Sequence, residues 1–300
     1  MSVQYRRARE DDLGPAQELV VHSINHLTER HGFGAMATVR ATAFESFSLH
    51  DDPDGLWVAE EAGEIVGFAF SWVCGDLWFL AELFVSPDHQ GRGIGSALLA
   101  LAEEHARKSG AKTRALITFA FNTVSQGLYI RHGIFPRLPL YNVSVARPAL
   151  AEHPHDGTLP PAPIEDTPAR LRSLAEIDRE VLGVSRERHH RHLIENGELR
   201  GVVFSTDGRP AGYAYISPGG HIGPVAVIRP DLLAAAFATA LELAAEGGSA
   251  QVSAFLPGTS EDLLGLAAER GMRITFPMVL ASSGDFGNWK QYLPRNPGFM

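Results

Sequence analysis

Residues 77–110 read LWFLAELFVSPDHQGRGIGSALLALAEEHARKSG, and the fold of the first half of the chain is organised around them. The apolar run Trp78–Val85 is typical of a buried strand. A glycine-rich turn, Gln90–Ser96, comes next, and the residues after it have the apolar spacing of a helix that stops at Gly110. The sequence therefore predicts a strand, a tight turn and a helix in direct succession.

The glycine-rich turn has the composition of an anion-binding site. Consecutive N–H groups at a helix start, with the positive end of the helix dipole behind them, attract an anion. Gly91, Gly93 and Gly95 let the backbone approach a phosphate without a Cβ in the way. No G-K-[ST] follows, and the spacing does not fit the G-x-G-x-x-G fingerprint of dinucleotide sites. A pyrophosphate site and an ordinary turn with structural glycines both stay open at this point.

The segments around the turn predict a mixed α/β sheet covered by helices. We expect a helix after the capping candidates Asp11 and Asp12, and a short helix over Asn122–His132. We expect strands at Val3–Ala8, Leu56–Glu60, Ile65–Trp72 and Arg114–Phe121, and a last pair of strands, broken by prolines, within Phe135–Val145.

With these segments in place, residues 3–145 resemble the GCN5-related N-acetyltransferase (GNAT) family. The family pattern [QR]-x-x-G-x-[GA] is matched in full by Gln90–Gly95. The later pattern N-x-x-[AS]-x-x-L-Y-x-x-x-G is matched by Asn122, Ser125, Leu128, Tyr129 and Gly133. The opening residues 5–13 also resemble the family's first strand and helix start. One departure is Ile134, which stands where an aromatic residue usually follows the glycine.

The resemblance implies that the turn holds the pyrophosphate of acetyl-CoA. It also implies that the strand before the turn is splayed and pairs its backbone with the pantetheine arm. The expected cofactor-binding residues are Leu83, Phe84, Val85, Gln90, Gly91, Arg92, Gly93, Ile94, Gly95, Ser96 and Asn122. Asn122 equally suits the N-cap of the short helix.

Glu82 and Tyr129 are the candidate catalytic residues. Acetyl transfer from a thioester to an amine needs one group that accepts a proton and another that returns one to the leaving thiolate. Glu82 lies in an apolar strand, where burial would raise its pKa toward that of a useful base; a solvent-facing position is the alternative. The resemblance implies that the Tyr129 hydroxyl faces the sulfur, and a half-buried packing tyrosine is the alternative.

The second half repeats the plan of the first half. Three pairs of segments match in the same order, residues 63–70 with 208–215, 83–88 with 226–231 and 128–133 with 266–271. The chemistry is lost, because Leu232–Ala238 replaces the glycine-rich turn. Val225, Ala267 and Ser260 stand where the first half has Glu82, Tyr129 and Asn122. The sequence therefore predicts a degenerate acetyltransferase-like domain.

The domain organisation follows from length and composition. Three hundred residues agree with two domains of about 150 residues each. We expect an acetyl-CoA-binding domain over residues 1–147, a proline-rich linker over 148–164 and the degenerate domain over 165–300. The fold class is α/β, with two tandem GNAT-like domains, each a mixed, mostly antiparallel sheet flanked by helices.

Several other segments carry open alternatives. The segment Arg186–His192 is interpreted as a solvated basic helix, because no ligand pattern completes a metal site, and no metal is expected. Residues 25–34 either line an acceptor pocket or form an ordinary helix end. The aromatic, proline-punctuated tail after Trp289 either docks across a cleft or is partly disordered. Cys74 is interpreted as a small apolar residue and not as an acyl carrier.

Net charge −9 and a pI near 5.8 argue against nucleic-acid and anionic-membrane partners. The single cysteine fits a reducing cytoplasm, and no export signal or membrane span is expected. The function hypothesis is an acetyl-CoA-dependent N-acetyltransferase that moves the acetyl group directly to a primary amine of a small molecule or peptide. The alternative is a non-catalytic acyl-CoA-binding or sensing protein. The identity of the amine, the length of the acyl group and a homodimer stay open.

Overall fold

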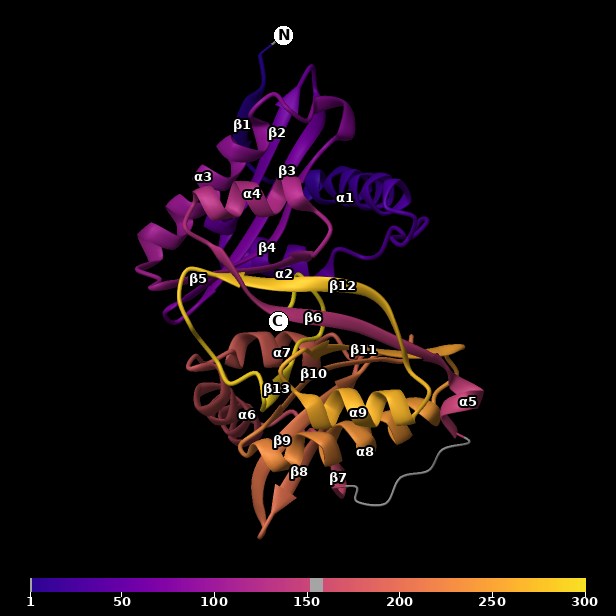
Figure 1. The fold of residues 1–300 in the computed structure, drawn as a ribbon. Helices are drawn as coiled ribbons and strands as arrows, with labels where there is room; N and C mark the ends of the chain where they lie inside the picture. The colour runs from indigo at the N-terminus through magenta and orange to yellow at the C-terminus, as the bar shows by residue number, and fades with distance from the viewer. Residues whose placement is uncertain (1, 152–158) are drawn as a thin grey trace. The chain divides into compact units, whose positions relative to one another are not determined.

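The structure is a computed structural model that describes residues 2–151 and 159–300. The chain forms two compact units, shown in Figure 1. Unit 1 contains residues 1–117, 121–135 and 281–284, and unit 2 contains 118–120, 136–280 and 285–300. Within the described residues, no helix combines the length and the apolar character needed to cross a bilayer.

Unit 1 is built on a sheet with the strand order β1-β2-β3-β4-β5. All neighbours in this sheet are antiparallel except β4 and β5, which are parallel. Its elements are β1 (Gln4–Arg7), α1 (Glu10–Arg30), α2 (Ala43–Asp51), β2 (Leu56–Glu61), β3 (Glu64–Cys74), β4 (Leu77–Val85), α3 (Ile94–Ser109), β5 (Thr113–Phe119) and α4 (Thr123–Arg131). Figure 1 shows α1 and α3 on opposite sides of this sheet.

Helices α1 and α3 form for reasons that the sequence makes visible. At the start of α1, the Asp12 carboxylate accepts a hydrogen bond from the backbone N–H of Arg9 at 2.7 Å. Helix α3 begins after Gly93, ends at Gly110, and both glycines have the left-handed conformation. The apolar face of α3 buries Leu98, Leu99 and other side chains against the sheet.

Unit 2 has the strand order β12-β6-β11-β10-β9-β8-β7. Its elements are β6 (Phe135–Ala146), α5 (Arg147–Ala151), β7 (Pro161–Pro163), α6 (Pro168–Leu182), α7 (Glu187–Glu195), β8 (Arg200–Thr206), β9 (Arg209–Ile216), β10 (His221–Val227), α8 (Leu233–Ala245), β11 (Gln251–Pro257), α9 (Glu261–Glu269), β12 (Arg273–Ser282) and β13 (Tyr292–Leu293). Strand β13 lies off this path and pairs with β10. The predicted α/β class with mixed, mostly antiparallel pairing is confirmed.

The structure divides the chain elsewhere than the composition shift does. Strand β6 pairs with β11 from Leu140 to Ala146, so residues 136–146 pack in unit 2. Of the expected linker 148–164, residues 152–158 lie outside the described residues, and the flanking residues form parts of α5 and β7. The units describe how residues pack, and the domain boundaries inferred from composition stay a prediction.

One expectation about local structure was wrong, and one helix was not expected. Phe135–Ala146 is one continuous strand, not a pair broken by prolines, because its long pairing with β11 outweighs the local signal of Pro136 and Pro139. Helix α2 was missed, because its nine residues lack a clear apolar stripe.

Candidate active site

The centre of the candidate site is an opening in the sheet of unit 1. Parallel pairing of β4 with β5 runs from Leu77 to Leu80, opposite Thr113 to Leu116, and ends there. A register shift against β3 falls at the same place, between the pairs Phe70–Glu82 and Ser71–Leu80. Within the described chain, residues 81–85 of β4 therefore pair with β3 alone, and the expected splaying of this strand away from β5 is present.

The backbone of Leu83 faces this opening. The Ser86 N–H donates to the Val66 carbonyl across β3 and β4 at 2.9 Å. Because hydrogen-bonding direction alternates along an antiparallel strand, Leu83 and Val85 turn their amide groups away from β3. The Val85 carbonyl accepts hydrogen bonds from the side chains of Gln90 at 3.1 Å and Ser23 at 3.3 Å. The amide of Leu83 is thus oriented to meet an extended ligand between the strands.

The glycine-rich turn is free of side-chain obstruction. Gly91 and Gly93 have φ values of +78° and +82°, and a Cβ at either would meet nothing within 4 Å. Among the described residues, no group accepts a hydrogen bond from the backbone N–H groups of residues 91–96. These N–H groups lie at the start of α3, where the helix dipole is positive. The turn is therefore a preformed cradle for an anion.

Two charged side chains beside the turn are paired with each other and leave the cradle open. Arg92 forms two hydrogen bonds with the Glu61 carboxylate, at 2.7 and 2.9 Å. The side chain of His89 also lies 3.3 Å from Glu61. The guanidinium of Arg92 is therefore held on Glu61.

Glu82 lies on the α2 side of the sheet and is largely buried, with a side-chain exposure of 10%. Burial, and after it the negative charge of Glu45, raise the pKa of the Glu82 carboxyl to about 8, although the positive charge of Arg40 opposes the shift. One Glu82 carboxylate oxygen lies 3.5 Å from Arg40 Nη2, which lies 2.8 Å from Glu45 Oε1. The solvent-facing alternative for Glu82 was wrong.

Tyr129 lies in the core on the other side of the same sheet. It is 6% exposed and packs in a cluster with Ile94 and Leu98 of α3, against which Leu83 and Val85 also pack. Burial raises the pKa of the Tyr129 phenol above its ordinary value, although a hydrogen bond with Ser125 acts in the opposite direction. The phenol therefore keeps its proton at neutral pH.

Side chains alternate between the two faces of a strand, so consecutive residues of β4 serve different sides of the opening. Glu82 pairs with Phe70 across β3 and β4. The ring centroid of Phe70 lies 5.5 Å from that of Phe44 in α2. Leu83 instead points to the cluster that contains Tyr129. A carboxyl on one face and a phenol on the other thus flank one gap in the sheet.

Asn122 caps α4. Its side-chain oxygen accepts a hydrogen bond from the Ser125 N–H at 3.2 Å, which is the N-cap interaction expected as the alternative to cofactor binding. Its role toward a cofactor stays a prediction.

Sequence reasoning missed Arg40 and Glu45. Arg40 lies in the segment before α2, and Glu45 lies in the first turn of α2 and is 3% exposed. A buried glutamate at the start of an unrecognised helix gave no local signal. Glu45 and Ser48, three residues apart, lie on one face of α2 and are both buried, but two polar residues at this spacing do not indicate a buried face from sequence.

The other candidate segments have clear places in the structure. Cys74 is buried at the end of β3. Residues 25–34 form the end of α1 and a turn in which the Asn25 side chain binds the backbone of Met36 and Ala37. Within the described part of the chain, no group of three His, Cys, Asp or Glu side chains is arranged to hold a metal ion.

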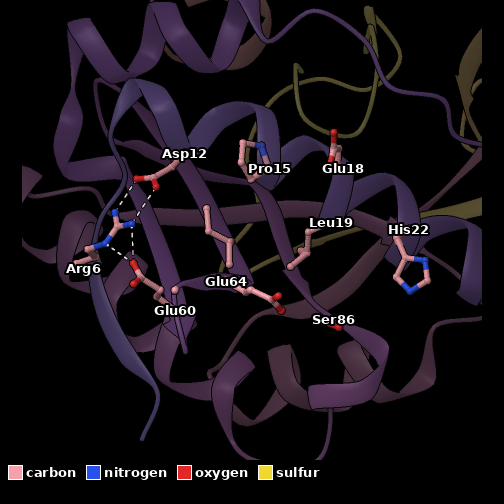
Figure 2. Close-up of a pocket in the computed structure, with 11 residues that line it drawn as sticks. Arg6, Asp12, Pro15, Glu18, Leu19, His22, Glu60, Glu64 and Ser86 are labelled. Atoms are coloured by element: carbon pink, nitrogen blue, oxygen red, sulfur yellow. Dashed lines mark hydrogen bonds and ion pairs between the residues drawn. The ribbon is translucent and has the colours of Figure 1, made fainter. Parts of the chain in front are cut away.

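A separate pocket of about 530 Å³ lies between α1 and the β2–β3 hairpin (Figure 2). Arg6 bridges Asp12 at 2.6 Å and Glu60 at 2.8 Å in its wall. None of the predicted site residues lines this pocket. It therefore lies apart from the opening between β4 and β5.

In unit 2, the corresponding opening is filled by the chain itself. In the described part of unit 2, strands β10 and β11 pair at His221–Ser253 and Ile222–Ala254 and no further. Beyond that point β13 pairs with β10, joining Val225 to Leu293 and Ala226 to Tyr292, and both residues of β13 are fully buried. The tail is thus docked in a cleft of unit 2, and the disordered alternative was wrong.

The basic segment around α7 has one buried face, formed by Arg186, His189 and His190, so its interpretation as a solvated helix was wrong for these residues. Asp178 accepts hydrogen bonds from Nε and Nη2 of Arg186, at 2.9 and 3.0 Å, and from His190 at 3.0 Å. The Tyr213 hydroxyl donates to the same carboxylate. These charges tolerate burial because each one has partners.

Comparison with known proteins agrees with this geometry. Residues 21–134 match the model of the Acetyltransferase (GNAT) family. An uncharacterized N-acetyltransferase of Archaeoglobus fulgidus is 33% identical over 124 residues, which are 38% of this chain and 80% of that protein. The chain belongs to the GNAT family and is an acetyltransferase.

Solved structures extend the likeness to the whole chain at the level of the fold. A putative acetyltransferase from Pyrococcus horikoshii has a TM-score of 0.78 at 18% identity and covers 99% of this chain and 96% of its own. A tandem GNAT protein from the clavulanic acid biosynthesis pathway has a TM-score of 0.64 at 19% identity, with coverages of 95% and 99%. The predicted fold class, two tandem GNAT-like domains, is confirmed.

Proposed function

We propose that unit 1 is an acetyl-CoA-dependent N-acetyltransferase that transfers the acetyl group directly to a primary amine. The observation that carries this proposal is the opening between β4 and β5, which has the free N–H groups of residues 91–96 at its end and Glu82 and Tyr129 on its two faces. Family membership supports the transfer of an acetyl group. The site offers residues for binding the acetyl donor and residues for accepting a proton from the amine.

The residues present fit acetyl-CoA. The turn offers successive N–H donors and bare glycine backbone to a pyrophosphate. The amide of Leu83 faces the gap, where an extended pantetheine arm would add to the strand as a ligand strand does. When bound, acetyl-CoA supplies the thioester carbonyl and the thiolate leaving group. We assign Leu83 to Val85, Gln90 to Ser96 and Asn122 to its binding.

Glu82 is proposed as the base. A primary amine enters as the ammonium and must lose a proton before its nitrogen can attack. A carboxyl with a pKa of about 8 is a far better proton acceptor than an ordinary glutamate, and near pH 8 about half of it is ionised. Water or direct contact completes the path from the amine to Glu82.

Tyr129 is proposed as the acid. Its phenol remains protonated because burial disfavours the phenolate, so it holds a proton that it can give to the leaving thiolate. Transfer within one complex needs no acyl-enzyme, and Cys74 is a buried residue at the far end of β3.

Calorimetry with acetyl-CoA tests the cofactor assignment. We expect the wild type to bind and Gly93→Trp to lose binding, because an indole would fill the cradle that residues 91–96 form. Gly208→Trp is the matched control, since Gly208 has a φ of +73° and open space around it, but lies in the β8–β9 turn of unit 2. Equal binding by Gly93→Trp and wild type would remove the assignment.

Acetylation of an amine panel then separates the enzyme from the non-catalytic alternative. Bound acetyl-CoA with no acetylated product on any amine would favour the sensing protein. The remaining expectations are part of this proposal: a small-molecule or peptide amine as partner, no nucleic-acid or membrane partner, a cytoplasmic location, and a homodimer as one option for assembly.

A further inference from the structure

The strongest unexplained feature of unit 1 is the charge cluster of Arg40, Glu45 and Glu82. Two carboxyl groups from different elements, α2 and β4, share one guanidinium from the segment before α2. The carboxylates are buried, with side-chain exposures of 4% for Glu45 and 10% for Glu82, whereas 55% of the Arg40 side chain is exposed. The cation therefore comes from the solvent side and the anions belong to the interior.

The cluster has more acceptors than donors. Oxygen Oε2 of Glu45 is buried and has no hydrogen-bond partner among the described residues. The hydroxyl of Ser48, one turn further along α2, is in the same condition within the described chain. A buried polar atom without a partner lowers stability, and a charged one does so more strongly, so such an atom needs an explanation. An incoming group with several N–H donors would supply one.

An alkylammonium ion has the chemistry that this cluster lacks. It carries one positive charge, as the Arg40 guanidinium does, and three N–H donors on a compact head. It would satisfy Glu45 and Glu82 together, and its nitrogen would lie beside the proposed base. The guanidinium of Arg40 occupies the position between Glu45 and Glu82 where the ammonium group would bind.

We propose that Glu45 and Glu82 together form the binding site for the acceptor's ammonium group, that Arg40 occupies this site in the absence of the acceptor, and that the acceptor is a cationic alkylamine. This inference rests on the proposed function and adds the substrate class. The ammonium displaces Arg40 and binds both carboxylates. Glu82 takes one proton, and the resulting neutral amine keeps two N–H groups, one of which stays on Glu45.

The proposal assigns opposite effects to Arg40 and Glu45. Glu45 is a positioning residue, so its removal weakens binding of the cationic acceptor. Arg40 competes with the acceptor, so its removal strengthens binding. A purely structural role of the ion pair predicts the same sign for both variants, because each breaks the same contact.

Calorimetry with pentylammonium chloride tests the binding step on the full chain in the presence of CoA, where no acetyl transfer occurs. We expect the Kd to rise about tenfold or more in Glu45→Gln and to fall severalfold in Arg40→Gln, since a hydrogen bond to a charged group is worth about 1.5–3 kcal/mol. Glu104→Gln is the control for net charge, because Glu104 is an exposed residue of α3. Weaker binding by Arg40→Gln, no effect of Glu45→Gln, or no binding of pentylammonium by Arg40→Gln would overturn the proposal.

Steady-state kinetics with acetyl-CoA adds a readout that separates this proposal from the proposed function. O-Butylhydroxylamine has the same shape as pentylamine but is neutral near pH 8. We expect Glu45→Gln to raise KM for pentylamine about tenfold, with little change in KM for the hydroxylamine. Equal effects on the two amines would overturn the ammonium site and leave the transferase intact. Binding of pentylammonium that depends on Glu45, without turnover of either amine, would support the site and count against the transferase.

Discussion

Both units have an opening in the sheet where two parallel strands separate, and the two openings differ in what fills them. In unit 1, β4 and β5 part after Leu80, and the N–H groups of residues 91–96 beyond β4 have no acceptor within the described chain. In unit 2, β10 and β11 part after Ile222, and β13 pairs with the freed edge of β10. An unpaired strand edge must find hydrogen-bond partners. Unit 2 finds them in its own chain, whereas the described residues of unit 1 leave that edge of β4 without a partner strand.

The charges of the two units differ in the same way. In unit 2, the carboxylate of Asp178 has donors on both oxygens, from Arg186, His190 and Tyr213. In unit 1, Glu82 and Glu45 share one exposed arginine, and an oxygen of Glu45 has no partner in the described chain. Saturated buried charges hold a structure together, and unsaturated ones are suited to bind and react.

Asp178→Asn tests the saturated cluster and has the largest expected effect. The change leaves the Arg186 charge buried without its counterion, so we expect the free energy of unfolding to fall by about 3–5 kcal/mol. Urea denaturation measures it. Asp231→Asn is the control, since Asp231 pairs with Arg229 at an exposed position, and its unfolding midpoint should stay at the wild-type value. An unchanged midpoint in Asp178→Asn would show that the cluster does not stabilise unit 2.

Tyr129→Phe tests the phenol that unit 2 replaces by Ala267. Removal of a general acid costs about 10²–10⁴ in rate, so we expect kcat to fall at least about a hundredfold with acetyl-CoA affinity nearly unchanged. Rapid-mixing assays and calorimetry on the same variant measure the two quantities. Tyr141→Phe, in β6, should keep wild-type turnover. Unaltered kcat in Tyr129→Phe would make the tyrosine a packing residue.

The pH dependence of kcat/KM tests the carboxyl that unit 2 replaces by Val225, and its expected effect is the smallest. Glu82 accepts a proton only when ionised, so activity should rise with pH and reach half its plateau near the pKa of about 8. Below that value, we expect about a tenfold fall per pH unit. Glu82→Gln should remove this limb together with most turnover. A limb that persists in the variant would belong to another group.

Local signals in the sequence were sufficient to predict the strand, the glycine-rich turn and the helix that surround the candidate site. The strand, the turn Gln90–Ser96 and α3 follow one another, so their geometry is set by neighbours in the chain. The positive φ of Gly91 and Gly93 follows from residue type. The burial of Glu82 was weighed against exposure and could be decided only by α2, which the sequence did not reveal.

The structure of the basic segment and of the tail depends on partners from distant segments, which the sequence did not reveal. Arg186 and His190 look like a solvated basic pattern until Asp178 and the tyrosines of β9 are placed around them. The tail looks like a frayed end until β10 offers its edge to Tyr292 and Leu293. Such outcomes depend on non-local pairing, which overrides local propensity.

The membership of residues 281–284 in unit 1 has a consequence for how the protein can be cut. The Ser283 N–H donates to the Arg114 carbonyl at 2.8 Å, and the Arg114 N–H donates to the Ser283 hydroxyl at 3.0 Å. A fragment ending at the proline-rich segment would lose these contacts and would carry β6 without β11. A recombinant dissection of the chain therefore has to keep residues 281–284 with unit 1 and β6 together with β11.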